Sequence, residues 1–171
     1  MTNAISIFNR VLGQHEETQA AEALKLQERA DAAASARSAF VSSFREAVAS
    51  VARPIFLEFV ADATARGFTA RVEENLGDLA RPSIALYVNP RKGRTGEHAS
   101  EHCSFELAAL VSISEVEHIS HFDLRANDRG HRINPDGTKR GAFGVASLHR
   151  DIIEREVEEF WKLSLTSRKP E

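Results

Sequence analysis

The sequence predicts an α+β fold: a long N-terminal Ala-rich helix kinked near Pro54, an antiparallel β-meander of four to five strands, and a C-terminal helix packed on one sheet face. Two observations lead to this prediction. From about Glu16 to Ala52 the chain has no Gly or Pro and is rich in strong helix formers. After Gly67 the apolar residues begin to alternate with polar ones, which is typical of half-buried strands.

The composition limits the class of protein. With 171 residues, 22 basic against 25 acidic side chains and 42% hydrophobic residues, the chain is neither a disordered acidic tail nor a highly basic nucleic-acid coat. A single cysteine, Cys103, excludes an intrachain disulfide and favours a reducing compartment. No apolar run approaches the roughly 18 residues that span a bilayer, and no signal-peptide pattern is present. We therefore expect a cytoplasmic, bacterial protein without a membrane span.

We divide the chain into an amphipathic segment at 1–15, a helical arm at 16–66, and a globular domain at 67–171 that also holds the end of the arm. Apolar residues at spacings of three and four predict two helical turns in the first segment, and we expect Gly13 to interrupt them. These apolar residues are Ile5, Phe8 and Leu12.

The arm carries a seam of residues that recur at alternating intervals of four and three. Its members are Leu26, Ala30, Ala33, Arg37, Phe40, Phe44, Ala47 and Val51. Small residues in the first half permit close helix contact, whereas bulky residues in the second half suit a core. In one interpretation the helix lies across its own sheet and has a solvated end. In the other, residues 16–36 pair with another copy or another protein, through an interface at Leu26, Ala30, Ala33 and Arg37.

The end of the arm is set by a proline and a glycine. Pro54 cannot donate to the carbonyl four residues back, so we expect a kink or a restart of the helix there. Arg66 followed by Gly67 is the pattern of a basic last turn and a left-handed C-cap. The helical part is therefore predicted to end at about residue 66.

Alternating apolar residues predict strands at 68–73, 84–88, 105–113 and 116–124. A parity shift near Ser112–Ser114 indicates a turn or bulge, and Asn134–Gly137 is a turn signal. Because no helical crossover separates the strands, the sheet should be antiparallel. One face meets the helices, and the other carries Thr69, Arg71, Glu73, Tyr87, Glu106 and Leu110. In the C-terminal helix the apolar stripe consists of Ile153, Val157, Phe160 and Trp161.

Six of the seven histidines lie between His98 and His149, which raises the question of a metal site. The candidate ligands are His102, His118 and His121. A divalent metal needs three or four converging ligands, but residues three apart on a regular strand point to opposite faces. We therefore interpret these residues as surface histidines with one in the core, predict no cofactor, and keep a metal-dependent enzyme as the second alternative.

Basic residues gather in the loops 91–94 and 125–140. The candidate phosphate contacts are Arg91, Lys92, Arg94, Arg129, Arg132, Lys139 and Arg140. Clustered positive charge is what binding to a phosphate backbone requires, so a nucleic-acid-associated protein is the first alternative. However, eight acids balance the eight bases between residues 87 and 149, which favours solvated turns.

No Walker-type loop, Gly-x-Ser-x-Gly elbow or His-Glu-x-x-His motif occurs in the chain, so the sequence leans away from an enzyme. Cys103 shares the parity of Phe105 and Leu107 and is predicted to be a small core residue. The favoured hypothesis is a non-catalytic binding or assembly protein that forms a homo-oligomer through its helical arm.

Overall fold

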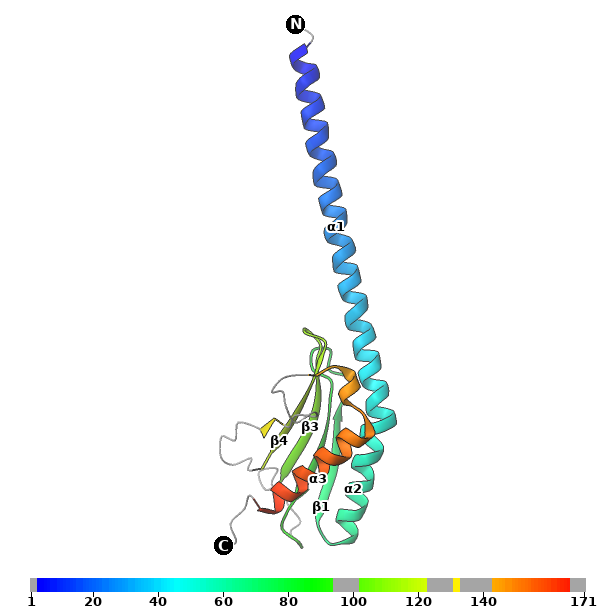
Figure 1. The fold of residues 1–171 in the computed structure, drawn as a ribbon, viewed down its shortest axis with the longest axis vertical. Helices are drawn as coiled ribbons and strands as arrows, with labels where there is room; N and C mark the ends of the chain where they lie inside the picture. Colours follow the sequence, from blue (N-terminus) through cyan, green and yellow to red (C-terminus); the bar gives the residue numbers. More distant parts are fainter. Residues whose placement is uncertain (1–2, 94–101, 123–130, 133–142, 167–171) are drawn as a thin grey trace. The chain divides into compact units, whose positions relative to one another are not determined.

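A computed structural model describes residues 3–93, 102–122, 131–132 and 143–166 (Figure 1). The elements are α1 (Asn3–Ala47), the π-helical turn η1 (Val48–Ala52), α2 (Arg53–Ala65), β1 (Thr69–Asn75), β2 (Ser83–Asn89), β3 (Cys103–Leu110), β4 (Glu115–His121), β5 (His131–Arg132), the short 3-10 helix η3 (Val145–Ser147) and α3 (Arg150–Thr166). The predicted α+β class is confirmed. The chain forms two compact units, Met1–Ala39 and Phe40–Glu171.

The α1 helix passes through Gly13 without a break, so the expected interruption there is wrong. A glycine inside a helix costs only about 1 kcal/mol relative to alanine. The strong helix formers on both sides of Gly13 outweigh that cost. The amphipathic segment and the arm are therefore one continuous helix.

The predicted irregularity near Pro54 takes the form of a π-helical turn. The Arg53 N–H donates to the Val48 carbonyl, five residues back, instead of to the residue four back. Pro54 occupies the first turn of α2, where a missing N–H costs least. The backbone stays helical through the π-helical turn, and Pro54 lies directly after it at the start of α2. Arg66 is the C-cap of α2, and Gly67 follows with a φ of 85°, as the sequence predicted.

The five strands form one sheet in the order β1-β2-β3-β4-β5, and every neighbouring pair is antiparallel. Leu86 lies opposite Phe105, and Leu107 lies opposite His118, so these four residues share one face. This face packs on η1, α2 and α3. The core contains Phe44, Val48, Ala52, Phe56, Ile84, Leu86, Cys103, Phe105, Leu107, Ile153 and Phe160.

Aromatic rings join the layers of this core. The Phe105 ring lies 5.8 Å from that of Phe56 and 6.0 Å from that of Phe160, so one strand residue contacts both helices. Trp161 makes edge contacts with Phe59 at 5.6 Å and Phe68 at 5.2 Å. The buried, apolar surroundings of Cys103 agree with its predicted place in the core.

The β3–β4 connection is a turn at residues 111–114, in which Ser114 adopts a φ of 55°. The strand predicted at 105–113 therefore begins earlier, at Cys103, and ends earlier, at Leu110. The parity shift near Ser112–Ser114 marks this turn. Ile113, which was expected in the strand, is exposed in the turn.

The second face of the sheet carries charged and polar side chains among small and apolar ones. The strand register places on this face the residues that the sequence predicted there, which run from Thr69 in β1 to Leu110 in β3. The Arg71 guanidinium lies 4.4 Å from the centre of the Tyr87 ring. Arg81 donates two hydrogen bonds to the Glu106 carboxylate, at 2.7 and 3.0 Å. These contacts give charged side chains on this face a partner.

Candidate functional site

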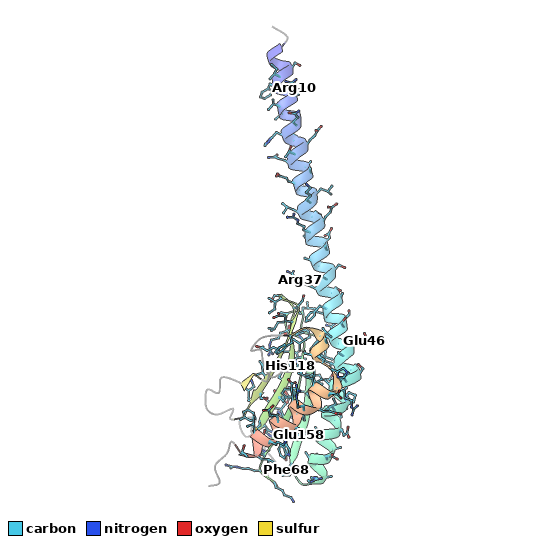
Figure 2. The ribbon with its side chains drawn as sticks, in the orientation of Figure 1. Arg10, Arg37, Glu46, Phe68, His118 and Glu158 are labelled. Atoms are coloured by element: carbon cyan, nitrogen blue, oxygen red, sulfur yellow. The ribbon has the colours of Figure 1, made fainter. Side chains whose placement is uncertain are left out.

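A polar network lies between the sheet and α3, in the middle of otherwise apolar packing. It consists of His118 on β4, Glu156 on α3 and Ser147 in η3. His118 lies within the second unit (Figure 2). Alternation along β4 turns Val116, His118 and Ser120 toward the helices, because Val116 and His118 lie opposite the core residues Ala109 and Leu107. The three side chains therefore reach one another from three separate elements.

Both nitrogens of the His118 imidazole form hydrogen bonds. Its Nδ1 lies 2.6 Å from Glu156 Oε2, and its Nε2 lies 2.9 Å from Ser147 Oγ. The side chains of His118 and Glu156 are 0% and 1% exposed, and Ser147 is 8% exposed. The other carboxylate oxygen, Glu156 Oε1, is buried and has no hydrogen-bond partner among the described residues. The Phe143 ring packs edge-on against the imidazole at 5.9 Å.

Electrostatics at this network are dominated by burial. Burial raises the pKa of the Glu156 carboxyl, whereas the hydrogen bond and the charge of His118 act in the opposite direction. Arg155 lowers the same pKa slightly, and Glu159 raises it slightly. If His118 were removed, little would remain to counteract the increase that burial causes in the pKa of Glu156.

The candidate metal ligands are not brought together in the described part of the chain. His118 belongs to the network, and His121 is three residues further along β4, opposite Ser104 on the other face. His102 is buried immediately before β3. Among residues 3–93, 102–122, 131–132 and 143–166, no three His, Cys, Asp or Glu side chains are placed to hold a metal ion.

The described residues include only some of the basic side chains that were proposed as phosphate contacts. The Arg91 N–H donates to Asn89 Oδ1 at 3.0 Å, and the aliphatic part of Lys92 lies against Gly67. Arg132 is in β5, of which only the backbone is described. The turn Asn134–Gly137 lies outside the described residues, and so do Arg94, Arg129, Lys139 and Arg140.

The candidate interface residues lie in the first unit. Residues 6–39 are exposed apart from Gly13, and this includes Leu26, Ala30, Ala33 and Arg37. Leu24 and Leu26 are 61% and 65% exposed. Side chains stand out from this part of α1 on all sides (Figure 2). Phe8 and Leu26 are separated by about five helical turns and therefore share one face, as do Leu12 and Ala30.

The second unit also has a groove between α2 and α3. A pocket of about 390 Å³ is lined by Phe59, Asp62, Ala63, Arg66, Phe68, Trp161 and Leu165. Its lining combines aromatic side chains with charged side chains of both signs.

Comparison with protein-family models, with curated proteins and with solved structures finds no match to this chain. Within the described residues, no helix is both long enough and apolar enough to cross a membrane.

The sequence missed Glu156 and Ser147, although one signal for Glu156 was available. Glu156 lies three residues after Ile153 and four before Phe160, so it falls within the apolar stripe of its helix. A charged residue at such a position needs a buried partner. His118 shares the parity of Val116 on its strand, which makes it a candidate for that partner.

Proposed function

We propose that the protein is a cytoplasmic assembly protein that self-associates through the helix of its first unit. The observation that supports this proposal is the exposure of residues 6–39 apart from Gly13, which include the first half of the seam and keep large apolar side chains in contact with water. Most helices in proteins are stabilised by packing of an apolar face, and this face has no partner within the described chain. A second copy would supply one.

The charges on the helix favour an antiparallel pair. In a pair centred on Leu26, residue 37 of one copy lies beside residue 15 of the other, because both are 11 residues from the centre. Arg37 would then approach Glu16 of the second copy. In a parallel pair Arg37 would face its own equivalent, and like charges in register are unfavourable. Ala30 and Ala33 allow the two backbones to approach closely.

The test compares two leucines on opposite sides of one helix. Leu24 and Leu26 are similarly exposed, but their side chains are separated by roughly 160° around the helix axis. Leu26→Glu combined with Ala33→Glu should weaken assembly, whereas Leu24→Glu should not. Burial of a leucine contributes about 1.5–3 kcal/mol, and a dimer has two copies of Leu26. The dissociation constant should therefore rise roughly 100-fold or more.

Light scattering and sedimentation over a range of concentrations measure this effect, and circular dichroism confirms that the variants remain folded. A wild-type protein that is monomeric at all concentrations would contradict the proposal, as would an equal effect of Leu24→Glu. Orientation can be tested by cross-linking, because Cys103 is the only cysteine and is buried. A mixture of Arg37→Cys and Glu16→Cys proteins should form mixed disulfides, and Arg37→Cys alone should form few.

A further inference from the structure

We propose that Ser147, His118 and Glu156 form a nucleophilic acyl-transfer site in which Ser147 attacks small esters. The three chemical groups occur in the order that such catalysis requires. A hydroxyl lies 2.9 Å from one imidazole nitrogen, and a carboxylate oxygen lies 2.6 Å from the other. A nucleophile within hydrogen-bond reach of a base, with that base oriented by a third group, is the signature of activated serine. This site is independent of the assembly role proposed above.

The carboxylate fixes which nitrogen can act as the base. An ionised Glu156 only accepts hydrogen bonds, so His118 must donate its Nδ1–H to Oε2. In neutral His118 the lone pair is then on Nε2, the nitrogen that faces Ser147 Oγ. The serine hydroxyl donates to this nitrogen. The network therefore places a proton acceptor directly at the hydroxyl.

A purely structural role explains this network poorly. Glu156 is 1% exposed, and its Oε1 lacks a hydrogen-bond partner among the described residues. An incompletely bonded carboxylate in a core is expensive, and an apolar residue of similar size often serves stability as well or better. In an acyl-transfer site the carboxylate has a use, because it stabilises the imidazolium that forms when His118 takes the serine proton.

The surroundings of Ser147 restrict the substrate. Gly144 and Ala146, close to it in the chain, are small exposed residues, while Phe143 and Val145 are half-buried. Ser147 itself is 8% exposed and therefore lies just below the surface. This arrangement suits a small, unbranched acyl group, and we infer short-chain esters as the substrate class.

The reaction balances without a cofactor. Ser147 Oγ attacks the ester carbonyl carbon while its proton passes to His118 Nε2. The ester C–O bond breaks, and the alcohol leaves with the proton that His118 returns. A water molecule then gives a proton to His118 while its oxygen attacks the acyl carbonyl carbon, and the bond between that carbon and Ser147 Oγ breaks. The carboxylic acid departs, the proton returns to Ser147 Oγ, and Glu156 stays ionised throughout.

The first experiment uses a fluorophosphonate, which forms a covalent bond with activated serines. We expect intact-mass spectrometry of the folded full-length protein to show one adduct, and peptide mapping to place it at Ser147. Ser147→Ala should abolish this adduct, and His118→Ala should slow its formation at least 100-fold. Ser104→Ala, which changes a buried serine outside the network, should label like the wild type.

The second experiment follows hydrolysis of p-nitrophenyl acetate. Glu156 is a positioning residue, and Glu156→Gln should lower kcat/KM by a factor on the order of 10⁴, as expected when the imidazole tautomer is no longer fixed. Glu156→Asp should restore part of the rate, and the pH profile should change in both variants. Ser147→Cys keeps a nucleophile at the same place and should react with iodoacetamide faster than Cys103.

Three outcomes would overturn the proposal. The first is that Ser147 stays unlabelled in the folded wild type under conditions that label a known serine esterase. The second is that labelling proceeds equally fast in His118→Ala, which would show that the imidazole activates nothing. Finally, ester hydrolysis at an unchanged rate in Ser147→Ala would assign any observed activity to another group.

Discussion

Replacing His118 with leucine tests how the second unit tolerates its buried carboxylate. The substitution removes the hydrogen bond to Glu156 Oε2 and leaves a carboxyl group that is 1% exposed without its principal partner. Removing the partner of a buried charge costs about 3–5 kcal/mol, because the remaining charge stays desolvated. Ser147 Oγ also loses its partner, which adds about 1 kcal/mol. We therefore expect His118→Leu to lower the free energy of unfolding by about 4–6 kcal/mol at neutral pH.

The expected pH dependence follows from the pKa of Glu156. Burial raises this pKa, and His118 acts against that effect, so the variant should have a still higher pKa. A carboxyl whose pKa is higher in the folded protein than in the unfolded chain binds protons preferentially in the folded state. The stability of His118→Leu should therefore increase as the pH falls from neutral toward the ordinary glutamate value of 4.5, relative to wild type.

Urea unfolding at several pH values, followed by circular dichroism, measures these changes. The double variant His118→Leu/Glu156→Leu should regain most of the lost stability, because it removes the unpaired charge together with its partner. Glu158→Gln, on the same helix but exposed, is the matched control and should have little effect. A cost below about 1 kcal/mol for His118→Leu, or a cost in the double variant equal to the sum of the two single costs, would refute this reasoning.

Three further predictions concern other parts of the second unit, and urea unfolding measures all of them. Gly67→Ala should cost about 1–2 kcal/mol because its φ of 85° is unfavourable for residues with a Cβ, and Gly77→Ala, in open space, should cost less. Phe160→Ala should cost about 3–5 kcal/mol, since this fully buried ring contacts another aromatic ring of the core; a cost below 1 kcal/mol would mean that the core is packed differently. The pKa of Glu74 is lowered by its hydrogen bond to Arg53, so its stabilising contribution is present above pH 4.5 and is lost as the pH falls through the folded-state pKa. Glu74→Gln should therefore reduce the loss of unfolding free energy as the pH falls into the acid range. The same loss in the variant as in the wild type would show that this ion pair is unimportant.

Local patterns were sufficient to predict the elements of this fold. The switch from helical periodicity to alternation after Gly67, and the Ile153–Trp161 stripe, are short-range features that each depend on one element only. Errors arose where competing local effects are close in energy. Gly13 weakens a helix by about 1 kcal/mol, which is too little to end it, and two serines next to an apolar run did not reveal where β3 stops.

The candidate site could be predicted only in part, because its members are far apart in the sequence. His118 and Glu156 are separated by 38 residues and meet only after α3 has packed on the sheet. The parity of His118 on its strand and the position of Glu156 within the apolar stripe of α3 are local signals that agree with the inward direction of each side chain. Ser147 gave no such signal, since its position depends on a short helix that leads into α3.

The π-helical turn also has a consequence for how the chain must be aligned with any sequence of the same fold. Phe44, Val48, Ala52 and Phe56 are all fully buried and recur every fourth residue. In a regular α-helix an interval of four overshoots one turn by about 40°, so the last of these side chains would have rotated away from the sheet. The wider turn absorbs part of that rotation. A homologous chain with one residue fewer between positions 48 and 52 would therefore need a regular helix and a buried stripe spaced by threes and fours.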